Sequence, residues 1–115
     1  MIQIYFLKKN FDTQKAERWF KERQVKAQMV DLSRARLGRR ELAMFRDRLG
    51  LRALIDEDAR AWKECPARFA AGEDAVLDAL AEDPRRLKLP IVRSGTQVTV
   101  GYAPDTWAGW PDVKG

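Results

Sequence analysis

Within the first 32 residues, the spacing of apolar side chains changes from that of a strand to that of a helix and back. This order of elements constrains the fold more than any other feature of the sequence. From Ile2 to Leu7 apolar side chains alternate along the chain, which predicts a short buried strand. Asp12 or Thr13 is expected to cap a helix that runs to about Glu22. A second strand is predicted over Lys26–Leu32, with Met29, Val30 and Leu32 as core residues. Two strands joined through a helix are expected to be parallel, with a right-handed crossover.

The middle of the chain is predicted to be helical. Three segments carry apolar residues at helical spacing: Gly38–Leu49, Asp56–Glu64 and Gly72–Glu82. Ser33 is a candidate cap for the first of them, and Gly50 is well placed to end it. Cys65-Pro66 is expected to stop the second, because the residue before a proline avoids the α region. We therefore expect a helical insertion over about residues 38–84.

The end of the chain returns to strands. Pro90–Arg93 and Gln97–Gly101 flank a glycine-containing turn, which indicates a β-hairpin. A final helical turn is predicted over Asp105–Trp110, with a frayed end from Pro111 onward. The order β-α-β, helical insert, β-β-α predicts one α/β domain that covers the whole chain, residues 1–115.

Two residue counts exclude several kinds of chemistry. The chain has no histidine and one cysteine, Cys65. The lack of histidine excludes Ser-His-Asp and Cys-His catalysis and removes the commonest zinc ligand, so no metal site is expected. A single cysteine allows no internal disulfide, and an unpaired thiol fits a reducing compartment. No apolar run is long enough for a membrane span, and Met1–Tyr5 does not begin a secretion signal, so we expect a cytoplasmic protein.

The net charge of +5 permits an acidic partner, either nucleic acid or an acidic protein surface. The densest basic stretch runs from Arg34 to Arg48 and is interpreted first as a solvated helix face. No aromatic residues alternate with its arginines as a stacking platform requires, so nucleic acid is not an expected partner. Trp107 and Trp110 are interpreted as core or crevice residues rather than as a docking surface.

Several short segments together resemble the arsenate reductase/Spx family. The segment from Ile2 to Phe20, which contains Lys8-Lys9-Asn10, resembles the first strand, active-site loop and first helix of that family. Further similarities lie at Asp31-Leu32, Leu54-Ile55-Asp56, Leu87–Val92 and Val100-Gly101-Tyr102. The resemblance covers roughly residues 2 to 110. It implies a thioredoxin-like (glutaredoxin-like) α/β fold, with a mixed β-sheet flanked by helices and the helical insertion between its β-α-β and β-β-α halves.

The resemblance also implies that the active-site loop has lost its nucleophile. In relatives a cysteine occupies the position of Asn10, and some relatives carry a second cysteine at the position of Thr13. The start of a helix stabilises a thiolate at such a place, whereas asparagine neither attacks arsenate nor forms a disulfide. The arginine that precedes the expected cis-proline, Pro90, is replaced by Leu89. No catalytic residue is therefore assigned.

The degenerate loop keeps features that suit an anion. Lys8 and Lys9 supply positive charge, and the free N–H groups of the following helix start are typical anion ligands. The candidate anion-binding residues are Lys8, Lys9, Asn10, Phe11 and Asp12.

Three functional hypotheses follow. The first is a redox-inactive binding or regulatory module, for which the similarity to Spx implies a protein partner such as RNA polymerase. The second is a glutathione/glutaredoxin-linked thiol oxidoreductase or arsenate reductase-like enzyme, in which Cys65 or an external thiol acts. Arsenate reduction is disfavoured because two further arginines of the family are replaced by Asp56 and Ala103. The third is an anion or glutathione binder without chemistry; no other cofactor is expected.

Overall fold

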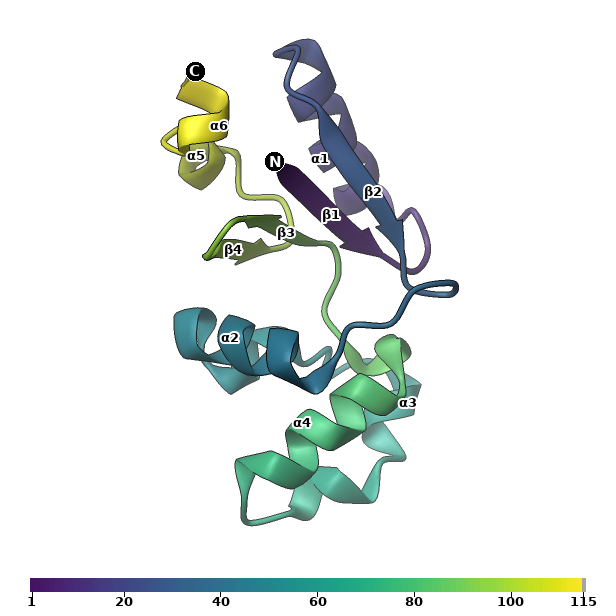
Figure 1. Cartoon of the computed structure of the whole chain (residues 1–115). Helices are drawn as coiled ribbons and strands as arrows, with labels where there is room; N and C mark the ends of the chain where they lie inside the picture. The colour runs from purple at the N-terminus through teal and green to yellow at the C-terminus, as the bar shows by residue number, and fades with distance from the viewer. Residues whose placement is uncertain (115) are drawn as a thin grey trace. The chain divides into compact units, whose positions relative to one another are not determined.

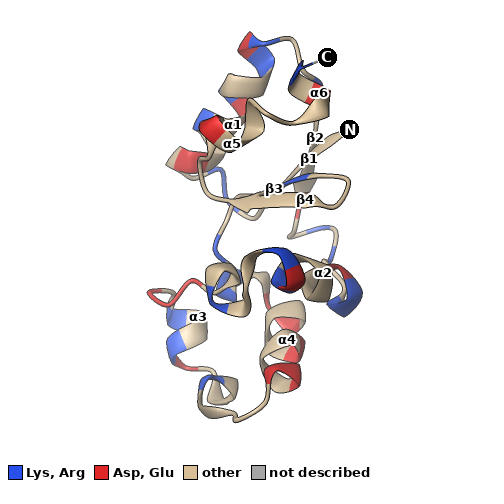
Figure 2. Ribbon diagram, turned by 90° about the vertical axis from the view of Figure 1, so that its left-hand side faces the viewer, with Lys and Arg blue, Asp and Glu red and all other residues tan. Residues whose placement is uncertain are grey.

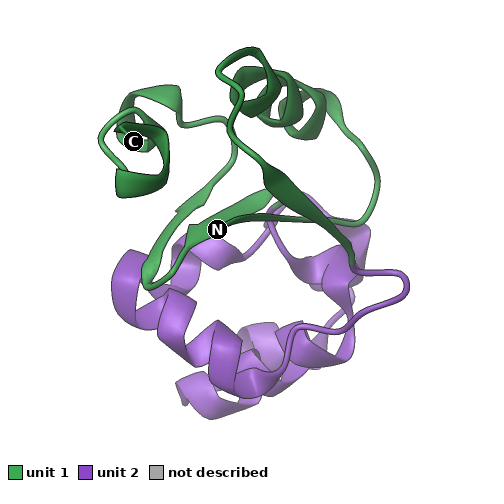
Figure 3. Ribbon diagram, turned by 45° about the horizontal axis from the view of Figure 1, so that its top comes forward, with its two compact units in different colours: residues 1–31, 89–115 green, residues 32–88 purple. Residues whose placement is uncertain are grey.

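The computed structural model describes residues 1–114, and Gly115, the last residue of the predicted domain, lies outside the described part. The chain forms two compact units, coloured separately in Figure 3. Unit 1 comprises residues 1–31 together with the chain from residue 89 onward, and unit 2 comprises residues 32–88. The grouping of both units into one domain stays a prediction.

Unit 1 contains a mixed sheet whose strands, among the described residues, stand in the order β2-β1-β3-β4 (Figure 1). The strands are β1 (Ile2–Phe6), β2 (Ala27–Asp31), β3 (Ile91–Ser94) and β4 (Gln97–Val100). β1 runs parallel to β2, and β3 pairs antiparallel with both β1 and β4. Ile4 of β1 lies between Met29 of β2 and Val92 of β3. The predicted parallel β-α-β opening and the closing hairpin are confirmed.

Three helices lie on one face of this sheet: α1 (Phe11–Glu22), α5 (Pro104–Trp107) and α6 (Pro111–Lys114) (Figure 3). Ile4, Phe20 and Trp107 have no exposed surface and belong to the apolar core that these elements share. The rings of Phe20 and Trp107 are 4.9 Å apart between centroids, and Trp107 Nε1 donates to Thr99 Oγ1 at 2.7 Å. Trp107 and Trp110 are thus core residues, as predicted.

Two predictions for unit 1 are wrong in detail. The final helix was expected over Asp105–Trp110, with fraying beyond it, but α5 ends at Trp107 and α6 follows. The second helix forms because the backbone carbonyl of Trp110 accepts from the N–H groups of Val113 and Lys114. The predicted second strand was assigned core residues at Met29 and Val30, yet both are only half-buried because β2 is an edge strand.

Unit 2 consists of helices and short connecting turns. Its elements are α2 (Arg39–Leu49), η1 (Leu51–Leu54), α3 (Arg60–Lys63), η2 (Pro66–Phe69), α4 (Glu73–Glu82) and η3 (Pro84–Arg86). The helical insertion of the predicted fold lies here. Gly50 ends α2 with a φ of 86°, a conformation that favours glycine, and its N–H donates to the Arg46 carbonyl.

Two helix starts in unit 2 differ from the predictions. Ser33 was the expected cap of α2, but Gly38 is its N-cap and its backbone N–H donates to the Glu41 carboxylate at 3.3 Å. The helix predicted over Asp56–Glu64 is reduced to α3. Its first residues stay outside the helix because the Asp56 N–H donates to the Arg86 carbonyl, while the Asp56 carboxylate accepts from the Asp58 N–H.

The basic stretch over Arg34–Arg48 is partly neutralised within unit 2. Arg39 forms ion pairs with Asp74 at 2.7 Å and with Asp78 at 3.3 Å. Arg46 pairs with Glu73 at 3.3 Å, so α2 and α4 are joined by ion pairs. Figure 2 shows by colour the basic residues of α2 and the acidic residues of α4. The expected solvated face therefore also joins two helices, although exposed ion pairs contribute little, about 0–1 kcal/mol each.

The end of α4 is held by side-chain bonds. Arg85 donates to the Asp83 carboxylate through its guanidinium and its backbone N–H, and these bonds lower the pKa of Asp83. Arg86 donates to the backbone carbonyls of Ala61 and Ala79, at 3.2 and 2.8 Å. This guanidinium ties the segment around α3 to α4.

None of the helices in residues 1–114 combines the length and apolar character that crossing a lipid bilayer requires.

Candidate functional site

The loop between β1 and α1 is organised by Asn10, which is the N-cap of α1. Its Oδ1 accepts from the backbone N–H of Thr13 at 2.8 Å, and its carbonyl accepts from Gln14 at 3.0 Å. The predicted cap at Asp12 or Thr13 is therefore wrong. Asparagine takes this place because its short side chain reaches the N–H three residues on while its own backbone stays extended.

The second half of the Asn10 amide joins the loop to the segment before β3. Its Nδ2 donates to the Leu89 carbonyl at 3.2 Å. The peptide bond from Leu89 to Pro90, the predicted cis-proline, is cis, and the Pro90 carbonyl accepts from the Gly101 N–H at 2.8 Å. Both functional ends of the Asn10 side chain are thus bound to the chain itself.

Two backbone N–H groups remain at the start of α1. Thr13 and Gln14 use theirs on Asn10, whereas the structure shows no acceptor in residues 1–114 for those of Phe11 and Asp12. Such groups carry the partial positive charge of the helix start and suit an anion. The Asp12 carboxylate lies beside Gly101, 3.8 Å from the place that a side-chain carbon there would occupy, and opposes an anion.

The two lysines of the loop differ in how much charge they offer. Lys9 Nζ lies 3.1 Å from a carboxylate oxygen of Glu17, so its charge is largely neutralised. Lys8 is exposed, and no acidic group in residues 1–114 lies within ion-pair distance of it. Of the five predicted anion-binding residues, Lys8 and the backbone of Phe11 and Asp12 are those with free capacity.

Thr13 occupies the position where the resemblance implies a second cysteine. It is fully buried, and its hydroxyl is the one buried side-chain polar atom among the described residues that finds no hydrogen-bond partner. Leaving a hydroxyl unpaired in this way costs free energy, about 1–3 kcal/mol by mutational measures.

A sequence model of a protein family matches nearly the whole chain. The sequence model of the ArsC family aligns with residues 5–110, which include the loop, α1 and the cis-proline segment. The chain belongs to the ArsC family.

Solved structures agree in fold. The chain superposes with a TM-score of 0.83 on a YffB protein, at 21% identity over 94% of this chain and 96% of the other. An arsenate reductase from Vibrio cholerae gives a TM-score of 0.80, at 22% identity over 91% and 92%. An arsenate reductase-related protein from Brucella melitensis gives 0.69, at 17% identity over 95% and 92%. The predicted thioredoxin-like α/β fold is confirmed. No curated protein matches the chain in sequence.

An aromatic cluster beside the ArsC-family loop escaped the sequence analysis. Phe11 is 79% exposed, and the Lys15 ammonium lies 5.8 Å from its ring centroid. The same ammonium lies 5.4 Å from the Tyr102 ring, which contacts Trp107 edge-on at 5.6 Å. The spacing of Phe11 and Lys15, one helical turn apart, was a usable signal, but the contact with Tyr102 depends on the fold.

Cys65 lies in unit 2 and is buried, with 4% of its surface exposed. It follows α3, and its backbone N–H donates to the Trp62 carbonyl. It therefore lies between α3 and η2, and it is the N-cap residue of η2. Among residues 1–114 no group of three or more acidic, cysteine or histidine side chains is arranged to hold a metal ion.

Proposed function

We propose that this ArsC-family chain is redox-inactive and acts in the cytoplasm as a binding or regulatory module. The observation that carries the proposal is the state of Asn10: a neutral amide stands at the start of α1, and both its ends are engaged by Thr13 and Leu89. A nucleophile at this place needs a free, ionised sulfur atom, and an amide offers none.

The rest of the chain does not replace the lost thiol. Cys65 is the single cysteine, so an internal disulfide cannot form during a catalytic cycle. Its burial restricts access to a substrate, and a buried thiol is poorly reactive. The positions that the resemblance assigns to oxyanion-binding arginines hold Leu89, Asp56 and Ala103, none of which binds arsenate through a cationic side chain. Arsenate reductase activity is therefore not proposed.

A coupled thiol-reductase assay tests this proposal. The native chain and the Asn10→Cys variant are compared with arsenate and with a small mixed disulfide, with glutathione and glutaredoxin as electron donors. We expect the native chain to be silent and the variant to reduce the disulfide, because the helix start favours a thiolate at this position. Turnover by the native chain contradicts the proposal, and a Cys65→Ala variant then shows whether that thiol is responsible.

Anion or glutathione binding without chemistry is a second candidate. It is supported by the two unpaired N–H groups of Phe11 and Asp12 and by the unpaired ammonium of Lys8. A titration of the isotope-labelled chain with glutathione tests it: the backbone signals of residues 8–12 are expected to shift. A Lys8→Ala variant should bind more weakly, whereas unchanged signals would exclude this candidate.

A further inference from the structure

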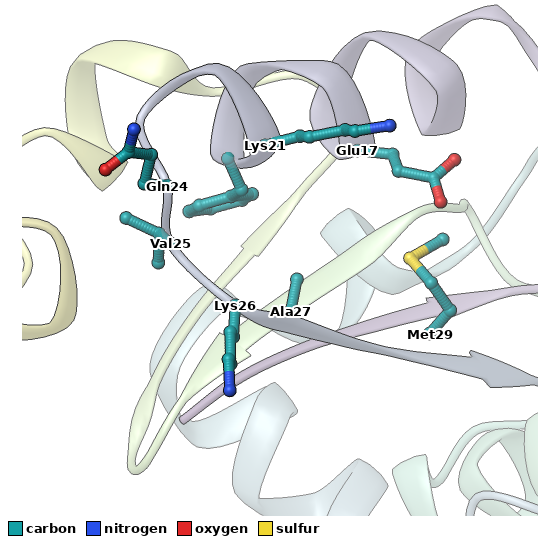
Figure 4. Close-up of a pocket in the computed structure, with 8 residues that line it drawn as sticks. Glu17, Lys21, Gln24, Val25, Lys26, Ala27 and Met29 are labelled. Carbon is teal, nitrogen blue, oxygen red and sulfur yellow. The ribbon is translucent and has the colours of Figure 1, made fainter.

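A pocket lies at the opposite end of α1 from the loop, between that helix and β2 (Figure 4). Its apolar lining comes from Phe20, Val25, Ala27 and Met29, and its volume is about 330 Å³. Roughly 300 Å³ is the lower end of the range for pockets that hold small ligands, and it accommodates one or two apolar side chains. Apart from Phe20, these lining residues are only half-buried, so apolar surface is left uncovered.

The pocket borders an open edge of the sheet. β2 pairs with β1 alone among the strands of residues 1–114, so alternate residues from Ala27 to Val30 direct backbone N–H and C=O groups away from the sheet. Such an edge is a template for a further strand. β2 carries no proline, and no lysine lies within it.

The side chains at this edge alternate between two faces. Figure 4 shows Ala27 and Met29 on the side of β2 that faces α1, and Lys26 on the opposite side. A strand added to β2 follows the same alternation. One set of its side chains would enter the pocket, and the other set would lie beside Lys26.

The charges around the pocket are unbalanced. Lys21 and Lys26 are exposed, and no acidic group in residues 1–114 lies within ion-pair distance of either. Glu17 also lines the pocket, but its carboxylate is paired with Lys9 at 3.1 Å. Among the charged residues that line the pocket, the two without an ion pair are therefore basic, and their complement is acidic.

The wall of the pocket is fixed by the end of α1. The Val25 N–H donates to the Phe20 carbonyl at 2.9 Å, and the Gln24 N–H donates to the Lys21 carbonyl at 3.0 Å. This pair of hydrogen bonds is the Schellman motif, in which the residues that close the helix also make an apolar contact. Gln24 adopts a φ of 58°, a conformation that is uncommon for a residue with a side chain. The pocket is thus formed before any ligand arrives.

We propose that the edge of β2 binds an extended peptide segment in which apolar and acidic residues alternate. The apolar side chains occupy the pocket, the acidic ones face Lys26, and the peptide backbone pairs with residues 27–30. A second copy of the chain is a poorer occupant, because it would bring the same unpaired lysines to the same edge. The site is separate from the Asn10 loop and does not depend on whether that loop is redox-active.

The test uses an alternating glutamate–valine hexapeptide with blocked ends and the isotope-labelled full chain. We expect its addition to shift the backbone signals of residues 21–30 and to slow amide hydrogen exchange in β2. An alternating lysine–valine hexapeptide is the matched control and should bind about tenfold more weakly, since charge complementarity decides between the two. A block peptide of three glutamates and three valines should also bind weakly, because its side chains cannot alternate.

A charge-swap variant sharpens the test. Lys26 is exposed, so Lys26→Glu leaves the core intact, and the variant is expected to reverse the preference toward the lysine–valine peptide. No shift in residues 21–30 with the glutamate–valine peptide overturns the proposal, as does a response confined to residues 8–12. Self-association through β2, seen by sedimentation and unaffected by the peptide, also overturns it. Thiol-reductase activity of the native chain would contradict the redox-inactive function and leave this inference standing.

Discussion

The two ends of α1 close the helix equally well but leave different groups unused. At the N-terminal end, the Asn10 side chain is bound to Thr13 and Leu89, while the N–H groups of Phe11 and Asp12 have no acceptor in residues 1–114. At the C-terminal end, a Schellman motif satisfies the backbone, while apolar surface and two unpaired lysines remain beside an open strand. The N-terminal end thus offers unpaired N–H groups that suit a small anion, and the C-terminal end offers apolar surface, two lysines and an open strand edge that suit a longer segment. This contrast supports a binding role.

The largest loss of unfolding free energy is expected from Phe20→Ala, because Phe20 belongs to the core and also lines the pocket. Its ring is fully buried against Trp19 and Trp107, at centroid distances of 5.0 and 4.9 Å. Removing a buried aromatic ring costs about 3–5 kcal/mol of unfolding free energy. Urea unfolding measures the loss.

Met29→Ala is the matched control, because Met29 lines the same pocket but is half-buried at the sheet edge. Its cost should be roughly 1 kcal/mol, since the exposed part of the side chain adds little. Equal losses from both substitutions would contradict the assignment of Phe20 to the core.

A smaller effect is expected from Asn10→Ala, which removes the side chain that closes the N-terminal end of α1. The variant loses the cap on Thr13 and the bond to Leu89, and loss of an N-cap side chain costs about 0.5–2 kcal/mol. Asn10→Asp is the control: it keeps the acceptor for Thr13 but cannot donate to the Leu89 carbonyl. We expect the order native, Asn10→Asp, Asn10→Ala in urea midpoint and in protection of the Thr13 amide. Full stability of the alanine variant would show that the loop is held by other contacts.

The sequence was sufficient for the elements whose signals are local. The alternation in β1, the apolar face of α1 and the glycine-containing turn of the β3–β4 hairpin predicted the sheet correctly, and Gly50 marked the end of α2. The resemblance added the position of the insertion. The predicted helix over Asp56–Glu64 was too long because the bond from Asp56 to Arg86 joins residues 30 positions apart, which no local pattern reveals.

In the candidate sites too, the sequence reveals residue types, whereas contacts between distant residues depend on the fold. The residue type at Asn10 was visible in the sequence, but its bond to Leu89, 79 residues away, required the fold. The pairing of Lys9 with Glu17 likewise changed which lysine is available. The sequence does not predict the pocket, because the apolar character of Met29 indicates a core residue, whereas its half-burial follows from the edge position of β2.

The smallest effect on stability is expected from Gln24→Gly, which tests the backbone conformation that closes the C-terminal end of α1. A residue with a side chain pays about 1–2 kcal/mol for the left-handed conformation that Gln24 adopts, whereas glycine adopts it freely. Part of this gain is offset by the greater freedom of glycine in the unfolded chain, about 0.4–1 kcal/mol, so a net stabilisation of about 0–1.6 kcal/mol is expected. Thermal unfolding measures it. The same substitution at Gln14, inside α1, is the control and should destabilise by about 1 kcal/mol or more, because glycine loosens the helix and the Gln14 side chain no longer donates to the Lys9 carbonyl. If both substitutions destabilise, the strain at Gln24 is not relieved by removing its side chain, and that side chain must hold the pocket wall. If Gln24→Gly stabilises but weakens the glutamate–valine peptide, the strained conformation is kept for binding rather than for folding.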